Sequence, residues 1–322
     1  MMRIVLFVLI LLAGAAFLLR TPEGDADALK AKYTNAASKF VASDDGHMQI
    51  HYRDEGARFG IPIVLIHGSS SSLHDWEPLL PHLRDEYRVI TLTLPGHGLT
   101  GPHPDDDYSY AAMADALDTV IHELELSAFV LGGSSMGGLV AWRYTLANPE
   151  RIRALILFNA AGMPLREGEK APPLNIGFQL VQNGLGRALM QQYTPRFIVK
   201  QSVEQTIADP ALASDELVDR YWALLRYPGN RRASTFRFSN PWAQSYVSLL
   251  NSISAPTLIV WGREDQLIYP SAAQTFDENL PNGDVIVYDN VGHLPMLETP
   301  ARAALDIDAY LERTLKNPLA EN

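Results

Sequence analysis

The chain has 322 residues, of which 47% are hydrophobic and 20% are charged, a composition typical of a folded globular protein. Its net charge of −11 argues against a nucleic-acid partner, because phosphate binding selects basic patches. The absence of cysteine excludes a cysteine nucleophile, a disulfide framework, thiolate metal sites and a lipoprotein cysteine anchor. The length suits one large domain that carries an insertion.

The first twenty residues are a separate hydrophobic segment. Arg3 is followed by an apolar run over residues 4–19 that ends at Arg20. As a helix, this run would span about 24 Å, somewhat less than a bilayer core of roughly 30 Å. We expect residues 1–20 to be an uncleaved signal-anchor or, alternatively, a signal peptide cleaved near Ala13-Gly14-Ala15. The folded domain is then expected on the periplasmic, extracytoplasmic side, either anchored to the membrane or secreted to the periplasm.

Strands and helices alternate in the next part of the chain. Residues 21–45 are polar and Ala-rich, and we expect a linker with room for one helix. From Gly46 onward, short apolar runs alternate with segments of helical periodicity, which predicts βαβ units and a parallel sheet covered on both faces. The predicted strands are residues 47–53, 63–66, 87–94, 128–132, 154–158, 256–261 and 284–288. The predicted helices of this part are residues 73–83, 108–124, 138–147 and one that begins at Thr299-Pro300.

The alternation stops at Met163-Pro164 and resumes near Pro256. The residues between contain helical stretches at 176–193 and 214–226 but no obvious strand. We therefore expect a discontinuous α/β core with a helical cap inserted between its halves. The predicted boundaries are core residues 46–163 and 248–315, cap residues 164–247 and tail residues 316–322.

Residues 133–137, Gly-Ser-Ser-Met-Gly, form a G-x-S-x-G motif. The run 128–132 before it predicts a buried strand, and residues 138–147 after it predict a helix. A sharp turn from a strand into a helix is the setting of a nucleophile elbow, where small residues let the two elements approach closely. Ser135 is therefore the predicted nucleophile.

A serine nucleophile needs a base, and the base needs an orienting acid. Elbow folds supply them in the chain order Ser, then Asp or Glu, then His. Asp265 follows one late strand and His293 follows the next. All three candidates thus lie at the carboxyl ends of predicted strands, where open α/β sheets place their sites. Glu264 is the alternative acid, but the distance from the strand end favours Asp265.

An oxyanion hole requires two backbone N–H donors. Met136, directly after Ser135, is the predicted first donor. The loop after residues 63–66 should supply the second, with Ser69 as the first choice and Ser70 as the second. His67 ends a buried strand and is predicted to be structural. The loop lacks the Lys-Ser/Thr ending of a P-loop, and His97 has no partner at metal-ligand spacing, so we expect neither a cofactor nor a metal.

Together these motifs resemble the α/β-hydrolase fold, in its capped form with a serine nucleophile. The resemblance covers roughly residues 46–315, and it implies a mostly parallel central sheet flanked by helices and a triad of Ser135, His293 and Asp265. Within the superfamily, the chain is similar to bacterial carboxylesterases and small lipases with an N-terminal signal or anchor. The motifs that carry the resemblance are His67-Gly68, Leu94-Pro95-Gly96-His97-Gly98, residues 133–138, residues 261–265 and Val291 to Glu298.

The chain also departs from the family pattern. Thr93 and Thr100 stand where relatives often carry Asp and Ser, which concerns loop structure more than chemistry. The serine at the elbow excludes the haloalkane dehalogenase and epoxide hydrolase relatives, which use aspartate. Relatives that hydrolyse carbon–carbon bonds often have Gly-Pro-Gly in the oxyanion loop and Trp after the histidine. Here Ser70-Ser71-Ser72 and Leu294 make that alternative weaker without removing it.

The resemblance implies hydrolysis of small carboxylic esters with short-to-medium acyl groups. Three alternatives remain open: a carbon–carbon bond hydrolase of ring-cleavage products, a thioester or lactone hydrolase, and a non-catalytic ligand-binding protein. Ser70, Leu294 and Trp222 are the expected substrate contacts. Membrane contact is expected through the N-terminal segment if it is uncleaved, and the sequence does not predict the oligomeric state. Three cap arginines could bind a substrate carboxylate, but solvated surface is the favoured interpretation of each: Arg226, Arg231 and Arg232.

Overall fold

A single eight-stranded sheet forms the centre of the protein. The computed structural model describes residues 20–173, 176–239 and 246–316. The strand order is β1-β2-β4-β3-β5-β6-β7-β8, with β2 antiparallel to β1 and β4, and all other pairs parallel. The predicted mostly parallel α/β sheet is confirmed. The strands are β1 Ser38–Ala42, β2 Gln49–Gly56, β3 Ile61–Ile66, β4 Tyr87–Leu92, β5 Phe129–Ser134, β6 Ile152–Phe158, β7 Thr257–Gly262 and β8 Gly283–Tyr288.

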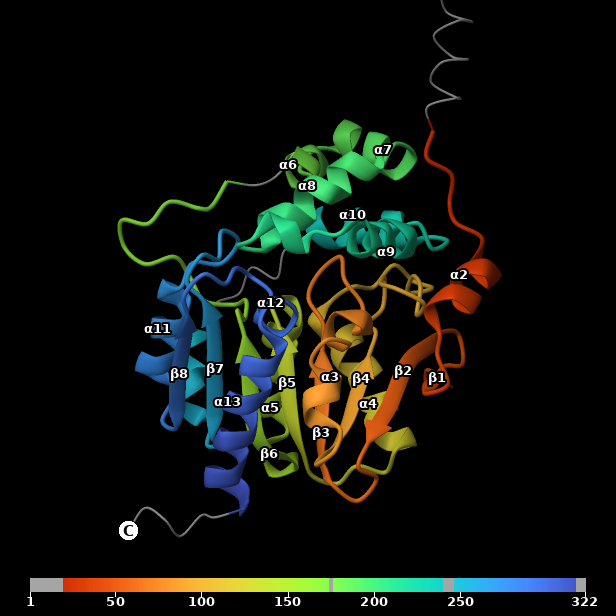
Figure 1. The fold of residues 1–322 in the computed structure, drawn as a ribbon. Coiled ribbons are helices and arrows are strands. Elements are labelled where there is room, and N and C mark those ends of the chain that lie inside the picture. Colours follow the sequence, from red (N-terminus) through yellow and green to blue (C-terminus); the bar gives the residue numbers. More distant parts are fainter. Residues whose placement is uncertain (1–19, 174–175, 240–245, 317–322) are drawn as a thin grey trace, which may run out of the picture.

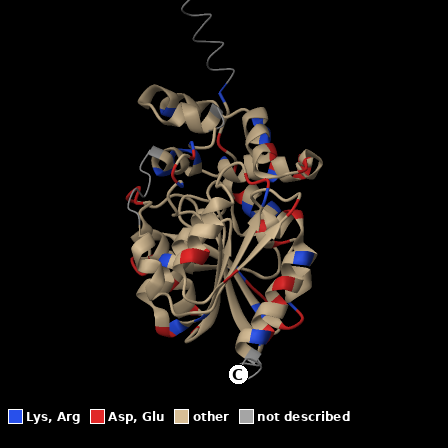
Figure 2. Cartoon of the chain, turned by 90° about the vertical axis from the view of Figure 1, so that its left-hand side faces the viewer, with Lys and Arg blue, Asp and Glu red and all other residues tan. Residues whose placement is uncertain are grey.

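Helices cover both faces of the sheet (Figure 1). Side chains alternate between the faces along each strand: in β6, Leu155 and Leu157 join one core cluster, and Ile156 and Phe158 join the other. The first face carries α4 Tyr110–Glu123, α5 Met136–Ala147 and α11 Ser271–Asn279, and the second carries α3 Leu80–Leu83 and α13 Pro300–Leu311. Charged residues lie mainly on the helices and loops, outside the sheet (Figure 2).

The register brings the loops after β3 and β5 together. Ile66, the last residue of β3, is paired with Leu92 at the end of β4 and with Gly133 near the end of β5. Parallel strands in this register finish at the same edge of the sheet, so the residues that follow them meet there.

The predicted linker, residues 21–45, is incorrect in part. It contains α2 Ala26–Tyr33 and the edge strand β1, which pairs with β2. The sheet therefore begins at Ser38 rather than after Gly46. Strand β1 was not predicted because all five of its residues are partly or fully exposed. An edge strand without a buried face lacks the alternation of apolar and polar residues on which strand prediction depends.

Among the described residues, five α-helices lie between β6 and β7, over the range predicted for the cap, and Figure 1 shows them as a layer over one end of the sheet. The stretch expected as one helix over residues 176–193 is two, because Asn183 caps the second by accepting a hydrogen bond from Gly186 N at 2.8 Å. The helices are α6 Ile176–Val181, α7 Gly184–Gln192, α8 Arg196–Thr206, α9 Asp215–Leu225 and α10 Asn230–Ser239.

The predicted N-terminal anchor or signal falls on residues 1–19, outside the described part of the chain, as does nearly all of the predicted tail. Among the helices of the described ranges, none is long and apolar enough to cross a bilayer. A short helix, α12 Pro295–Glu298, separates β8 from α13.

Candidate active site

Ser135 lies in the sharp turn between β5 and α5. Its φ of 53° and ψ of −117° are strained for a residue with a side chain. The backbone around it holds this conformation: Ser135 N donates to Phe158 O at 3.0 Å, and Ser135 O accepts from Ala161 N at 2.9 Å. The turn is therefore fastened to the end of the neighbouring strand β6, and the serine side chain projects beyond the sheet.

Glycine is required beside this serine for steric reasons. A Cβ atom on Gly137 would lie 2.3 Å from Ile66 O, and one on Gly133 would lie 2.3 Å from Gly137 O. Both distances are far below van der Waals contact, and the obstacles are backbone atoms that cannot rotate away. The small residues of the motif thus allow α5 to pack directly against β3 and β5.

His293 and Asp265 form a buried pair. The histidine Nδ1 lies 2.7 Å from Asp265 Oδ2, and because a carboxylate only accepts, Nδ1 is the protonated nitrogen. The other carboxylate oxygen, Oδ1, accepts from Leu267 N at 2.7 Å and Ile268 N at 3.1 Å. This arrangement fixes the imidazole and leaves Nε2 as the acceptor, which is the form that a general base needs.

Asn159 also holds this pair, and sequence reasoning missed it. Its amide Nδ2 donates to Asp265 Oδ2 at 2.6 Å, and its Oδ1 accepts from Gly262 N at 3.3 Å. The residue is fully buried and has a φ of 44°. Its position directly after the end of β6, at the same sheet edge as the other site residues, was the available signal.

Two glutamates position the loop that carries His293. Glu298 accepts from Gly292 N at 3.0 Å and from Leu294 N at 3.1 Å, on either side of the histidine. Glu264, the alternative acid, accepts from Val291 N at 2.9 Å. It therefore orders the loop backbone, and Asp265 is the acid that contacts the imidazole.

Ser135 and His293 line one cavity of about 430 Å³ beneath the cap. Among the described residues, none forms a hydrogen bond with the Ser135 hydroxyl; such contacts are often longer in unliganded sites and tighten when substrate binds. The remaining wall is largely apolar. It includes Val181, Met190, Ile198, Val199, Val203, Leu225, Phe238, Leu267 and Leu294.

The two predicted oxyanion donors are adjacent. Ser69 Oγ lies 3.2 Å from Met136 Sδ, and Ser69 also lines the cavity. Within the described ranges, no residue accepts a hydrogen bond from either backbone amide. Met136 is the first residue of α5, where the helix dipole favours negative charge. The arrangement can therefore receive an anionic oxygen beside Ser135.

The structure places two of the three predicted substrate contacts in the cavity wall. Ser70 and Leu294 line the cavity, but Trp222 does not, so this prediction is wrong for Trp222. Its indole N–H donates to Thr194 O at 2.8 Å and its ring packs under Arg226. Residues four apart share a helix face, and on α9 the face toward the cavity carries Tyr221 and Leu225.

The cavity also contains buried charge. Arg231, expected at the surface, is only 7% exposed and lines the cavity. The other two arginines lie elsewhere, with Arg226 on Trp222 and Arg232 paired with Asp106. Asp75 lines the same cavity, and burial raises the pKa of its carboxyl above the usual range.

Asp75 connects the oxyanion loop to the cap. The Tyr221 hydroxyl lies 2.8 Å from both of its carboxylate oxygens, and Ser71 donates to one of them. Since Ser71 belongs to the loop after β3 and Tyr221 to α9, this carboxylate ties the cap to the loop that carries Ser69.

Two buried histidines near the elbow support loops. His67 Nδ1 lies 2.7 Å from Gly68 O and its Nε2 accepts from Leu94 N at 3.0 Å, which agrees with the predicted structural role. His97 Nδ1 lies 2.9 Å from Pro95 O. Burial lowers the pKa of His67 well below its ordinary value and the pKa of His97 to about 4, so both are neutral at physiological pH.

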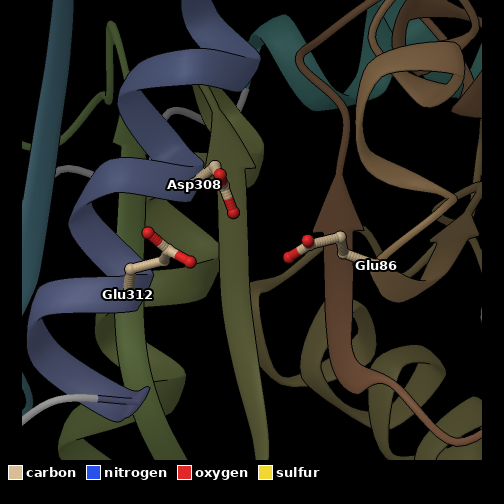
Figure 3. Close-up of side chains that lie close together, drawn as sticks. All are labelled: Glu86, Asp308 and Glu312. Carbon is tan, nitrogen blue, oxygen red and sulfur yellow. The ribbon is translucent and has the colours of Figure 1, made fainter.

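Glu86, Asp308 and Glu312 form the one acidic group of the described residues in which carboxylate oxygens lie within 4.8 Å of one another (Figure 3). They belong to α13 and its continuation and to the residue before β4, away from the cavity. Asp308 already accepts a hydrogen bond from the Tyr87 hydroxyl at 2.6 Å. Surface carboxylates of this kind are common without an ion, and the expectation of no metal or cofactor stays a prediction.

Comparisons with known proteins agree with this architecture. The alpha/beta hydrolase fold family matches residues 61–300. The 2-hydroxymuconate semialdehyde hydrolase of Pseudomonas sp. (strain CF600) is 28% identical over 275 residues, which cover 82% of this chain and 90% of that protein. A meta-cleavage product hydrolase from Pseudomonas fluorescens IP01 is 25% identical with a TM-score of 0.71, over 85% of this chain and 97% of that one.

An esterase is among the similar structures as well. The thermophilic esterase from Thermogutta terrifontis is 24% identical with a TM-score of 0.71, over 87% of this chain and 99% of that one, a likeness that shows the fold alone. The match of the family over most of the chain, together with the sheet order and the strained serine turn, shows that the protein belongs to the α/β-hydrolase fold family.

Proposed function

We propose that this hydrolase-fold protein is a serine hydrolase that cleaves carboxylic esters. One observation carries the proposal: a serine in a strained turn and a histidine oriented by a buried aspartate open into the same apolar cavity. The two unengaged amides of Ser69 and Met136 beside the serine support it further. A protein that only binds ligands has no need for this combination.

In the proposed mechanism, His293 Nε2 removes the Ser135 proton as the serine oxygen attacks the ester carbonyl. Asp265 keeps the imidazole in the required tautomer and stabilises its cation. The amides of Ser69 and Met136 stabilise the oxyanion, each by about 3 kcal/mol. His293 then protonates the leaving alcohol, and water attacks the acyl-enzyme by the same route.

The cavity supports an ester with a short-to-medium acyl chain. Its volume of about 430 Å³ lies within the range of ordinary small-molecule sites. Its apolar side chains come from both the cap and the core, so a hydrocarbon chain could extend from Ser135 toward α7 and α8. Thioesters and lactones would use the same groups.

Hydrolysis of a carbon–carbon bond is the second candidate. The names of the meta-cleavage and semialdehyde hydrolases that the chain resembles support it. So does Arg231, because a buried cation in an apolar cavity suits a substrate that carries a carboxylate. The ester proposal differs in needing no charged group on the substrate.

The test compares the two substrate classes with one enzyme preparation. The full chain in mild detergent is assayed on p-nitrophenyl esters from acetate to palmitate and on 2-hydroxymuconate semialdehyde, with Ser135→Ala as the control. The proposal expects a maximum at one ester length that vanishes in the variant. Faster turnover of the semialdehyde than of any ester would favour the second candidate. Turnover of neither would favour a ligand-binding protein.

We also propose that residues 1–19 hold the protein at a membrane. The support is the length and apolarity of this run between Arg3 and Arg20, which suit a signal-anchor better than a cleaved peptide. Separation of membrane and soluble fractions, followed by N-terminal sequencing, tests this proposal. An intact N-terminus in the membrane fraction is the expected result, and a soluble product that lacks these residues would contradict it.

A further inference from the structure

The segment that follows the apolar run is fastened to the cap. Thr21 N donates to Gln192 O at 2.9 Å, and Thr21 O accepts from the Arg231 guanidinium at 2.6 Å. Gly24 N donates to Arg226 O at 2.7 Å. We call residues 20–24 the strap. Its other bonds are Arg20 to the Gln192 side chain, Thr194 N to Thr21 Oγ1, Arg226 Nε to Pro22 O and Gly229 N to Glu23 Oε1.

The strap has a fixed end on each side. Toward the C-terminus it continues into α2, whose Leu29 and Tyr33 are buried with Leu99 and Leu224. Toward the N-terminus it ends at Arg20, beside the end of α7. Because five consecutive residues form hydrogen bonds with the cap, the strap is held in place and is not a flexible linker. The position of Arg20, the first described residue, is therefore set by its contact with the cap.

The same part of the cap exposes apolar side chains. Leu185 is 74% exposed and Leu189 is 45% exposed, and because they are four residues apart they share one face of α7. Phe197, at the start of α8, is 67% exposed. Figure 1 shows α7 and the strap close together, at the end of the molecule opposite the C-terminal end of α13.

Helix α7 also forms part of the cavity wall. Met190, the residue after Leu189, lines the cavity, while Leu185 and Leu189 face outward. One helix, about 10 Å in diameter, thus separates the cavity from this exposed apolar face. Arg231 and Thr194, both bonded to the strap, line the same cavity.

From these contacts we propose that the outer face of the cap, formed by Leu185, Leu189 and Phe197, lies on the lipid surface, and that the strap fixes this orientation. The proposal rests on the membrane attachment proposed above for residues 1–19, and it adds which face meets the bilayer. A surface beside an anchoring point is held close to the lipid, and exposed leucine and phenylalanine side chains enter the acyl boundary favourably. The cavity would then lie directly beneath the membrane surface, where lipid esters are available.

Because the chain contains no cysteine, a single introduced cysteine can be labelled at a chosen position, and the depth of that position in the bilayer can be measured. Single variants Leu185→Cys, Leu189→Cys and Phe197→Cys of the full chain are labelled with a fluorophore and reconstituted into phosphatidylcholine vesicles that contain nitroxide-labelled lipid. Leu305→Cys is the matched control, because Leu305 is 70% exposed and lies on α13, outside the cap. Unfolded variants are excluded by circular dichroism and thermal melting.

The proposal expects lipid nitroxide to quench the three cap labels at least about 3-fold more than the Leu305→Cys label, as for side chains buried roughly 5–10 Å into the interface. Equal quenching at all four positions would overturn the proposal. Cap labels that are shielded from lipid by a second copy of the chain would overturn it as well. This readout needs no turnover, so failure of the ester proposal leaves it intact. Failure of membrane attachment appears separately, as protein that does not float with vesicles.

A double variant extends the test to substrate access. Leu185→Asp with Leu189→Asp should lower the hydrolysis of esters in vesicles about 10-fold, because charge opposes interfacial contact, while hydrolysis of a soluble short ester stays unchanged. Equal rates of the variant and the wild type on vesicles would contradict the orientation.

Discussion

Around Ser135 the contacts that set its position are made by the backbone, whereas in the cap above it side chains make many of the contacts, beside the backbone bonds to the strap. The serine turn is held by amide hydrogen bonds to Phe158 and Ala161 and by helix packing that only Gly137 permits. The cap is held by pairs such as Tyr221 with Asp75 and Trp222 with Thr194 O. A turn held by backbone contacts tolerates few substitutions. The cavity wall formed by cap side chains can change its shape, and with it the specificity, by substitution. The predictions below test this contrast.

The largest effect is expected from Ser135→Ala, which removes the proposed nucleophile without altering the fold. We expect ester hydrolysis to fall by more than about 10⁴-fold, as when a triad member is removed. Ser134→Ala is the control, since its buried hydroxyl has no partner among the described residues. Steady-state rates with matched thermal melts check the prediction. Comparable losses in both variants would refute the distinct role of Ser135.

Gly137→Ala should destabilise the protein by about 3 kcal/mol, the upper range for overpacking, because the new Cβ would meet Ile66 O. Gly184→Ala, at the start of α7, meets no atom closer than 3.8 Å and should be neutral or stabilising by up to about 1 kcal/mol. Denaturant unfolding measures both. If the two variants were equally stable, the proposed difference in steric constraint between the serine turn and the cap would be wrong.

Replacement of Asn159 by alanine should lower kcat by about 10- to 100-fold, within the range for residues that orient a catalytic group, while KM changes little. The amide bond to Asp265 would be lost, and the Asp265–His293 pair would be less well fixed. A full kinetic comparison across pH checks the prediction. If KM rises and kcat is unchanged, Asn159 affects substrate binding instead.

In the cap, Met190→Trp should narrow the cavity and lower hydrolysis of long esters about 10-fold, because bulk in an apolar pocket discriminates by roughly 1–3 kcal/mol. Acetate hydrolysis should be unchanged. Leu189→Trp, the outward-facing neighbour on α7, is the control on soluble esters. An unchanged chain-length profile in Met190→Trp would mean that this wall does not contact the acyl group.

The smallest effect concerns pH. His97 has a folded-state pKa of about 4, below the ordinary 6.5, because of burial. The unfolded chain therefore binds the proton first, and the stability from neutral His97 is complete above pH 6.5 and is lost as pH falls toward 4. When the pH is lowered from 7.5 to 5.5, the free energy of unfolding should fall by about 1 kcal/mol more in the wild type than in His97→Gln. Parallel pH profiles of the two proteins would contradict this assignment.

Much of the fold and of the site could be predicted because strand ends carry short, recognisable motifs. Ser135, Asp265 and His293 each follow an apolar strand, and parallel strands end together. Their proximity therefore follows from the order of elements alone. The same argument predicted that Met136 and Ser69 would be neighbours.

Other features depend on contacts that no local pattern encodes. Asn159 is one polar residue in a short loop, and only the structure shows that its amide reaches Asp265. Arg231 lies in a run of polar residues and has the local appearance of a surface group, yet cap packing buries it. Trp222 was misplaced because helix periodicity does not say which face of α9 meets the cavity. Edge strand β1 was missed because it lacks a buried face.

The central claim is that Ser135 is chemically activated by His293. Incubation of the full chain with a fluorophosphonate, followed by peptide mass spectrometry, tests it directly, since this reagent modifies serines activated by a base. The account predicts one adduct per chain, on the peptide that contains Ser135, with loss of labelling in His293→Ala. No adduct on a folded wild-type protein, or an adduct at another residue with ester hydrolysis intact, would contradict it.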